Sequence, residues 1–418
     1  MKARISKSII GGTITAPPSK SYTIRSLFVA ATAAGTSRII NPLVSEDTKA
    51  AAEVLERLGA VIERQPGVWI ITGGQLKPPQ QELDCRQSAA TLRFLTPLCA
   101  SLSGPSRITF APGLARRPMT PLLDILKQLG IAAENRPDYM LINGGRVNTR
   151  VVSLPGDISS QFISGLMLAA SQFPDGLQIK LTTPARSKDY LRMTMACLRH
   201  FSVNADHNDT LTEFTVRQQT PRPTNYEVEG DWSGASYFLG MGALNGPVSI
   251  CGLNPGSFQA DRFMLNCLEQ MGATVTIDND KIMVEPSMLQ AVNVDLDEAI
   301  DLLPTVACLA AAAKGTSLIT GLRRARLKES DRIRALAENL KPMSISVTEE
   351  TDRLLITGGQ PHGAVIDSFE DHRIAMAFAM LSAVCGDSII EGADCVNKTY
   401  PDFWEDFQQV GGKVILSE

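Results

Sequence analysis

The chain has 418 residues, of which 44% are apolar and 20% are charged, and its formal net charge is -4. This length allows two or three domains with large cores. The slightly negative charge argues against nucleic-acid binding or a membrane-surface role for the whole molecule.

The N-terminal stretch MKARISKSIIGGTITAPPSK lacks the apolar segment of a signal peptide, and no apolar run reaches the length of a membrane span. The eight cysteines are scattered without a C-x-x-C pair, and the four histidines show no metal-ligand spacing. We therefore expect a cytoplasmic protein with reduced thiols and no bound metal.

An internal repeat organises the chain. Six segments share an apolar run, a glycine turn and a short β-prone stretch, and the turns recur roughly every 70 residues. The turn glycines are Gly35, Gly104, Gly176, Gly246, Gly315 and Gly386. The apolar runs are too rich in alanine to be surface helices, so we expect them inside a domain with strands outside.

Six repeats predict an α/β protein with two domains of three repeats each. The first domain would be discontinuous, 1–18 plus 229–418, and the second would be 19–228, with the active site in the cleft between them. A solenoid is the alternative for a long repeat, but no terminal repeat has the polar outer face that a solenoid end needs.

The first charged motif in chain order is APPSKSYTIRSL, residues 16–27. Ser19 or Ser21 can cap a helix, which places Lys20 at its start and Arg25 on the same face as Ser21. Helix N-termini favour anions because their backbone N–H groups are free and the helix dipole is positive there. The competing interpretation is an ordinary capped helix with solvated charges.

Three further motifs in the first half also precede helices. GLARRPMTPLLDIL places Arg117 before a proline, LPGDISSQFISGLMLA contains Ser159, Ser160 and Gln161, and PARSKDYLRM contains Ser187. Neutral donors in a row suit a sugar-like or phosphorylated ligand, although two serines before a helix are more often only a cap.

In the second half, AIDLLPTVACLAAAA has one carboxylate, Asp301, before a long apolar helix. It is either a simple cap or a base whose pKa is set by cationic neighbours. In RLKESDRIRAL, Ser330 can cap a helix, so that Lys328 and Glu329 lie in the approach loop and Arg332 in the first turn.

Two later motifs complete the pattern. FEDHRIAMAFAM places Arg373 at the start of a buried helix, where an arginine needs an anionic partner, and CVNKTYPDFWEDF supplies Lys398. Several cations imply more than one anionic group on the ligand, and two carboxyl groups among them could move protons. The sequence does not indicate a nucleotide ligand, because it has neither a G-x-x-x-x-G-K-[ST] loop nor a G-x-G-x-x-G motif after a strand.

Taken together, PPSKSYTIR, SSQF, RSKDY, VEGDWSGASY, LKESDR, EDHRIAMAF and NKTYPDF resemble the signatures of the 5-enolpyruvylshikimate-3-phosphate synthase family, nearly end to end. The resemblance implies a two-domain inverted α/β barrel of the enolpyruvyl transferase type, with six βαβαββ repeats. It implies transfer of the enolpyruvyl group of phosphoenolpyruvate to the 5-hydroxyl of shikimate 3-phosphate, on the shikimate pathway to aromatic amino acids. It also implies a monomer without metal or organic cofactor.

The resemblance assigns roles to residues that match the family motifs. The residues expected at shikimate 3-phosphate are Lys20, Ser21, Arg25, Ser159, Ser160, Gln161, Ser187, Asp301 and Lys328. Those expected at phosphoenolpyruvate are Lys20, Ala89, Arg117, Gln161, Arg332, Arg373 and Lys398. Asp301 would take the proton from the 5-hydroxyl and Glu329 would protonate the methylene carbon, while the cations, Lys20 among them, stabilise a tetrahedral intermediate.

The chain departs from the family in DCRQSAATLRF, residues 84–94. Gln87 stands where many members have asparagine, and Ala89 replaces the glycine that lines the phosphoenolpyruvate pocket. The added methyl group would crowd the analogue glyphosate more than the substrate, which predicts reduced glyphosate sensitivity. Arg324 stands where one branch has asparagine, and it is either a further anion contact or an exposed side chain.

Three other functions are compatible with parts of the sequence. UDP-N-acetylglucosamine enolpyruvyl transferases carry a Lys-Asn pair at the first helix and a reactive cysteine before the Arg-Pro pair. Here these positions hold Lys20-Ser21 and Leu114-Ala115. A non-catalytic paralogue that binds an anionic metabolite rests only on the altered 86–90 stretch. A repeat scaffold for protein partners leaves the cations at the helix starts unexplained.

Overall fold

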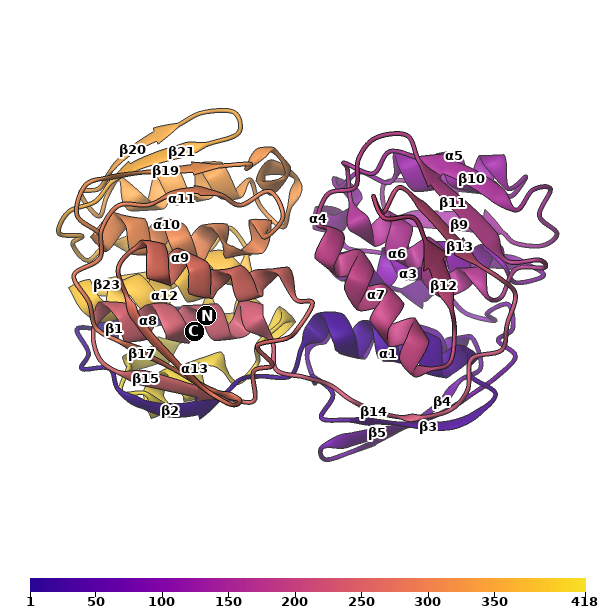
Figure 1. Ribbon diagram of the computed structural model, residues 1–418, viewed down its shortest axis with the longest axis horizontal. Coiled ribbons are helices and arrows are strands. Elements are labelled where there is room, and N and C mark those ends of the chain that lie inside the picture. Colours follow the sequence, from indigo (N-terminus) through magenta and orange to yellow (C-terminus); the bar gives the residue numbers. More distant parts are fainter. The chain divides into compact units, whose positions relative to one another are not determined.

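The computed structural model describes residues 1–418, and the chain divides into two compact units (Figure 1). Unit 1 comprises Met1–Pro17 and Glu229–Glu418, and unit 2 comprises Pro18–Val228. The chain therefore passes between the units twice. The sequence had placed residue 18 with the discontinuous part, whereas Pro18 belongs to unit 2 in the structure.

Unit 2 holds three four-stranded sheets and seven α-helices. Its strands are β3 (Gly35–Ile40), β4 (Val61–Gln65), β5 (Val68–Gly73), β6 (Leu83–Asp84), β7 (Pro105–Thr109), β8 (Ala132–Asn135), β9 (Tyr139–Asn143), β10 (Val151–Leu154), β11 (Leu177–Leu181), β12 (Ala205–His207), β13 (Glu213–Val216) and β14 (Asn225–Glu227). Its helices are α1 (Lys20–Thr32), α2 (Glu46–Arg57), α3 (Ala89–Ala100), α4 (Pro112–Ala115), α5 (Thr120–Gln128), α6 (Ser160–Ala170) and α7 (Lys188–His200).

Unit 1 also holds three four-stranded sheets. Its strands are β1 (Lys2–Ser6), β2 (Gly12–Thr15), β15 (Val248–Cys251), β16 (Thr274–Asp278), β17 (Lys281–Glu285), β18 (Asn293–Asp295), β19 (Thr316–Thr320), β20 (Ser346–Glu349), β21 (Leu354–Thr357), β22 (Val365–Asp367), β23 (Ser388–Glu391) and β24 (Lys413–Ser417). Its α-helices are α8 (Trp232–Leu244), α9 (Met264–Gln270), α10 (Leu303–Ala312), α11 (Arg332–Leu340), α12 (His372–Cys385) and α13 (Phe403–Gln409). Its 3₁₀ helices are η1 (Ala260–Phe263), η2 (Ile300–Leu302), η3 (Arg323–Leu327) and η4 (Ala393–Lys398).

All six sheets follow one pattern, a parallel pair of strands extended by two antiparallel neighbours. In the first sheet of unit 2 the order is β14-β3-β5-β4, and Tyr226 lies opposite Ile39, which lies opposite Trp69. Strand β14 is last in the unit but completes its first repeat, and β2 and β1 complete sheets in unit 1 in the same way. Each unit is therefore closed by strands from its chain ends.

The alanine-rich helices form the cores of the units, as the sequence predicted. In α12 twelve of the fourteen residues, from His372 through Ala383, are buried, and α8 and α10 are buried almost throughout. Figure 1 shows α8, α10 and α12 within unit 1 with strands around them, and α1, α3 and α6 hold the equivalent place in unit 2. Small side chains let these helices approach each other closely, which leaves the strands to cover them.

Ligands and polar side chains can bind at the N-termini of the core helices. At the C-termini, carbonyl groups already accept hydrogen bonds from backbone N–H groups. The last carbonyls of α8, α10 and α12 accept hydrogen bonds from the N–H groups of Ser287 (to Ala243), Gly359 (to Ala311) and Ser8 (to Ala383). The free N–H groups at the starts are left for side-chain caps and ligands. No helix is both long enough and apolar enough to cross a membrane.

The caps decide one sequence prediction, which left Ser19 and Ser21 open, and correct another, which made Ser330 a cap. Helix α1 begins at Lys20 with Ser19 as its N-cap, so Ser21 lies inside the helix. Helix α11 is capped by Asp331, whose carboxylate accepts from the Arg334 N–H, and not by Ser330. Ser330 instead donates to Asp371 at 3.0 Å. A carboxylate is the stronger partner for the positive end of a helix, which favours Asp331 over the adjacent serine.

Gly165 provides a test of helix packing in unit 2. A Cβ atom at this position of α6 would lie 3.2 Å from the carbonyl carbon of Arg93 and 3.3 Å from Cα of Phe94, both in α3. The backbone of α3 cannot easily shift to make room for a methyl group. We therefore expect Gly165→Ala to lower the free energy of unfolding by about 1–3 kcal/mol in denaturant titrations. Gly113→Ala is the control, because its Cβ atom would lie 4.0 Å from the nearest atom, Nη2 of the Arg116 side chain, and equal losses in both variants would contradict this account.

Candidate active site

A buried cluster of charges occupies the helix starts of unit 1, and we call it the unit 1 cluster. Its members are Asp301, Lys328, Glu329, Arg332, Asp371, Arg373 and Lys398. Asp301 lies in η2 just before α10, Arg332 opens α11, Asp371 caps α12, and Lys398 ends η4. Thus residues up to about 100 positions apart in the sequence meet because each stands before a core helix or its neighbour.

Arg332 is the centre of the cluster. Its Nε lies 2.8 Å from Asp371 Oδ2, its Nη1 lies 2.7 Å from Asp301 Oδ1, and its Nη2 lies 2.8 Å from Glu329 Oε2. The side chain is only 1% exposed. Burial disfavours its charge, but the three carboxylates outweigh that effect and raise the pKa of Arg332.

Asp301 accepts from three cations. Besides Arg332, Lys328 Nζ lies 3.1 Å from Oδ1 and Arg373 Nη2 lies 3.4 Å from Oδ2. Burial would raise the pKa of this carboxyl group, but Arg373, Lys328 and Arg332 together hold it well below its usual range. In this state Asp301 is ionised and paired with three cations. It can accept a proton only after these cations turn toward a ligand.

Lys328 and Glu329 complete the loop before α11. Burial lowers the pKa of Lys328 to about 8, an effect that the charge of Asp301 partly offsets. Glu329 lies 2.8 Å from Arg332 and 3.6 Å from Lys398 Nζ. The loop therefore places a titratable amine against Asp301, which Arg332 also binds, and a carboxylate against Arg332 itself.

Arg324 belongs to a separate ion pair. Its Nη2 lies 3.1 Å from Asp297 Oδ1, and its side chain is 14% exposed. It is therefore not the exposed side chain that was one of the two alternatives.

In unit 2, Lys20 and Arg25 lie on α1. Lys20 Nζ is 3.1 Å from Asp47 Oδ2, in α2. Arg25 is buried and joins α1 to α7: its Nε donates to Thr194 Oγ1 at 2.8 Å and its Nη2 to the Tyr190 carbonyl at 3.4 Å. Burial lowers the pKa of Arg25. The guanidinium is positioned by neutral acceptors and by the ring of Phe94, 5.3 Å away.

The start of α6 is organised by Arg93, a residue of α3 that the sequence analysis did not select. Its Nη1 donates to Gln161 Oε1 at 2.7 Å and to Ser159 Oγ at 3.4 Å, and its Nη2 donates to the Pro118 carbonyl at 3.4 Å. Arg93 thus links the N-cap of α6 to the segment next to Arg117. The available signal was an arginine inside the apolar run ATLRF, which demands a buried partner.

The remaining predicted residues of unit 2 lie at helix starts. Ala89 is the first residue of α3 and is 6% exposed. Ser160 begins α6. Ser187 caps α7 in a left-handed backbone conformation with φ 53°, a strained geometry for serine that is found at functional sites.

The predicted residues thus fall into two sets. Lys20, Ser21, Arg25, Ala89, Arg117, Ser159, Ser160, Gln161 and Ser187 belong to unit 2, and Asp301, Lys328, Glu329, Arg332, Arg373 and Lys398 belong to unit 1. The sequence analysis missed Asp47 and Asp371, the carboxylates that hold Lys20 and Arg332. No group of three or more histidine, cysteine, aspartate or glutamate residues is arranged to hold a metal ion. The chemistry available is cationic binding of anions together with proton transfer by carboxylates.

Comparison with known proteins identifies the family. The family model described as EPSP synthase (3-phosphoshikimate 1-carboxyvinyltransferase) matches residues 6–407. A Dehalococcoides mccartyi protein named 3-phosphoshikimate 1-carboxyvinyltransferase is 49% identical over 417 residues, 99% of each chain. A Halobacterium salinarum protein of the same name is 39% identical over 422 residues, 97% of each chain.

Solved structures agree on the fold. EPSP synthase from Acinetobacter baumannii is 27% identical and superposes with a TM-score of 0.85 over 100% of both chains. The enolpyruvyl transferase NikO from Streptomyces tendae, 18% identical, has a TM-score of 0.80 over 99% of this chain and 98% of its own, and it supports the fold alone. The expected enolpyruvyl transferase type of α/β fold is confirmed. Together with the full-length matches in sequence, this establishes that the chain belongs to the EPSP synthase family.

Proposed function

We propose that this protein is a 3-phosphoshikimate 1-carboxyvinyltransferase of the shikimate pathway, which supplies aromatic amino acids. It transfers the enolpyruvyl group of phosphoenolpyruvate to the 5-hydroxyl of shikimate 3-phosphate and releases phosphate. Membership of the family over the full length supports the activity. The observation that carries it in the structure is the unit 1 cluster, where Asp301 is covered by Lys328, Arg332 and Arg373. An anionic ligand can replace the carboxylate at these cations.

In the proposed site, phosphoenolpyruvate is held by Lys20, Arg117, Gln161, Arg332, Arg373 and Lys398, with Ala89 against it. Shikimate 3-phosphate is held by Lys20, Ser21, Arg25, Ser159, Ser160, Gln161, Ser187, Lys328 and Asp301. The proposal requires the residues of both units to act on one pair of substrates, as expected of a cleft between two domains. Guanidinium groups suit this task because they bind carboxylate and phosphate oxygens through two parallel hydrogen bonds.

The reaction then proceeds by addition and elimination. Glu329 first takes up a proton when the substrates replace it at Arg332 and Lys398. It then gives this proton to the methylene carbon of phosphoenolpyruvate, the 5-hydroxyl oxygen bonds to the C2 atom, and Asp301 takes the hydroxyl proton. The resulting tetrahedral intermediate loses phosphate, which takes up the proton held by Asp301, and a methyl proton, which returns to Glu329. The enolpyruvyl double bond is then restored and both carboxyl groups are back in their starting states. The cations that exchange their carboxylate partners for substrate oxygens stabilise the negative charge of the intermediate. No step calls for a metal or an organic cofactor, and we further propose that the enzyme works as a cytoplasmic monomer.

Phosphate release distinguishes the proposed function from two of its rivals. A UDP-N-acetylglucosamine enolpyruvyl transferase would release phosphate from phosphoenolpyruvate with that sugar nucleotide in place of shikimate 3-phosphate. A binding paralogue would bind shikimate 3-phosphate without releasing phosphate. One assay with each acceptor separates the three.

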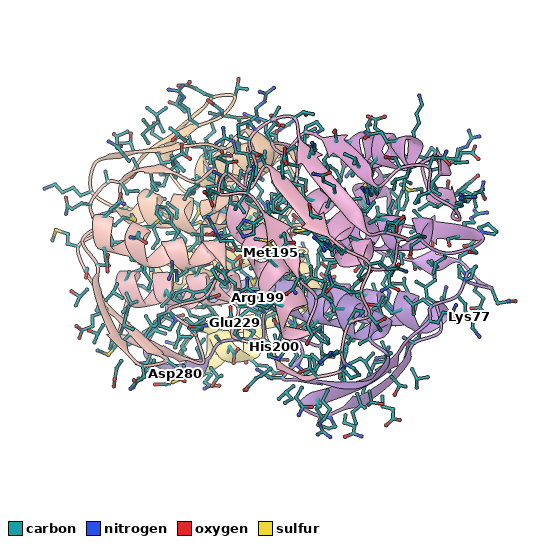
Figure 2. All side chains as sticks on the ribbon, turned by 45° about the vertical axis from the view of Figure 1, so that its right-hand side comes forward. Lys77, Met195, Arg199, His200, Glu229 and Asp280 are labelled. Atoms are coloured by element: carbon teal, nitrogen blue, oxygen red, sulfur yellow. The ribbon has the colours of Figure 1, made fainter.

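The first prediction concerns Asp301. We expect phosphate release only when phosphoenolpyruvate and shikimate 3-phosphate are both present, and a loss of kcat of about 10²–10⁴-fold in Asp301→Ala, because the base is removed. Asp280→Ala, an exposed carboxylate between β16 and β17 that Figure 2 labels, is the control and should keep its activity. Wild-type activity in Asp301→Ala would exclude it as the base.

The second prediction concerns Lys328. The charged amine binds shikimate 3-phosphate, and its pKa of about 8 means that the charge is present below pH 8 and lost above it. We therefore expect the dissociation constant of shikimate 3-phosphate, measured by calorimetry without phosphoenolpyruvate, to rise as pH increases through 8. Lys328→Arg should remove this rise, because arginine stays charged.

The exposed Lys314 supplies the control for this titration. Lys314→Arg should show the wild-type pH dependence. A rise above pH 8 that persists in Lys328→Arg would assign the titration to another group.

The third prediction concerns Ala89. Its methyl group, at the start of α3, should crowd glyphosate more than phosphoenolpyruvate, so the wild-type enzyme should bind glyphosate weakly. Removing a crowding methyl group is worth about 1–3 kcal/mol, so Ala89→Gly should lower the glyphosate inhibition constant by about 5- to 150-fold. Ala90→Gly is the control at the next position. A micromolar inhibition constant in the wild-type enzyme would contradict the prediction.

A further inference from the structure

A buried carboxyl group that the proposed mechanism does not use lies next to the unit 1 cluster. Asp261, in η1, is 1% exposed. Its Oδ2 accepts a hydrogen bond from Ser233 Oγ, and its Oδ1 is buried without any hydrogen-bond partner. An ionised carboxylate in this position would lack half of the hydrogen bonds that it needs, which is costly in a dry interior.

The segment that carries Asp261 is fixed to the start of α8. Gln259 Oε1 accepts from the Trp232 N–H at 3.1 Å, and Ser233 lies in the first turn of the helix. Asp231 caps the same helix by accepting from the Gly234 N–H at 2.8 Å. Hydrogen bonds to the start of α8 therefore fix both the backbone segment of Asp261 and its carboxyl group.

Four groups act electrostatically on the Asp261 carboxyl group. They are Asp301 of η2, Arg373 of α12, and Asp231 and Ser233 at the start of α8. Burial is the main cause that raises the pKa of Asp261, to about 7, and the negative charge of Asp301 adds to it, while Arg373 and the Ser233 hydrogen bond act in the opposite direction. When two carboxyl groups repel each other, the one that is bound by more cations, here Asp301, stays ionised, and the other takes up a proton at a higher pH.

The charge balance of the cluster depends on that proton. Lys328, Arg332, Arg373 and Lys398 supply four positive charges, and Asp301, Glu329 and Asp371 supply three negative ones. A neutral Asp261 leaves one positive charge in excess for an anionic ligand. An ionised Asp261 would cancel it.

We propose that Asp261 is a positioning residue of the reaction. Its carboxyl group, hydrogen-bonded to Ser233, is protonated and neutral, so that the positive charge of Arg373 is available to the anionic donor substrate. This inference rests on the proposed function, since it takes phosphoenolpyruvate as that substrate. It assigns to Asp261 no contact with the reacting atoms. Ionisation of Asp261 should weaken donor binding without removing the catalytic groups.

The test measures the KM for phosphoenolpyruvate by phosphate release between pH 6 and 8.5, in wild-type enzyme and in two variants. If only the protonated form binds well, the wild-type KM rises about tenfold by pH 8, one pH unit above the pKa of about 7. Asp261→Asn, which is always neutral, should not show this rise. Comparing variants at the same pH cancels the titration of the substrate's own phosphate.

Ser233→Ala supplies a second, directional test. Its hydroxyl lowers the pKa of Asp261, so its removal should move the rise in KM to higher pH without abolishing it. Asp406→Asn is the matched control, because Asp406 also has a raised pKa, caused first by burial, but accepts from Tyr400 at 2.5 Å and does not belong to the cluster. A wild-type profile in Asp261→Asn would overturn the proposal.

An infrared measurement separates this proposal from the proposed function. The difference spectrum of wild-type minus Asp261→Asn protein should show a protonated carboxyl band at pH 6 that disappears by pH 8.5. An ionised carboxylate already present at pH 6 would overturn the proposal whether or not the protein releases phosphate. Failure of phosphate release in every variant would instead refute the function, with the infrared result still deciding the state of Asp261.

Discussion

The ion pairs of the buried Arg332 guanidinium are the interactions on which the unit 1 cluster depends. The guanidinium is shared by carboxylates from η2, from the loop before α11 and from the cap of α12. Removing one partner from a buried ion pair costs about 3–5 kcal/mol, because the remaining charge is stranded. Asp371 also accepts from the Arg373 N–H at 3.0 Å and from Ser330 Oγ at 3.0 Å. The same carboxylate therefore fixes the start of α12, the loop and the guanidinium.

This arrangement couples binding to proton transfer. Without a ligand, the cations around Asp301 hold its pKa well below the usual range, and the carboxylate is a poor base. Substrate oxygens that take over Arg332 and Arg373 would remove the same stabilisation from Asp301. Its proton affinity then rises when the substrates are in place. A site built this way does not need a carboxyl group that is basic in the free protein.

Much of the fold and part of the site could be read from the sequence, because both depend on local patterns. The repeat of apolar run, glycine turn and β-prone stretch is visible along the chain, and so are cations just before helices. What could not be read is which carboxylate meets which cation, since Arg332 and Asp371 belong to different repeats. Asp261 lies in QADRF, which has the composition of a solvated turn, so only tertiary packing shows it to be buried.

The two units balance their charges differently. In unit 1 each guanidinium of the cluster meets carboxylates, so a ligand must compete with charges already present. In unit 2, the hydrogen bonds of Arg25 go to a hydroxyl group and to backbone carbonyls, which position the guanidinium without neutralising it. Burial without an opposing carboxylate lowers the pKa of Arg25, whereas three carboxylates raise that of Arg332. Arg25 is thus suited to holding an anion firmly, and the unit 1 cluster is suited to exchanging protons with one.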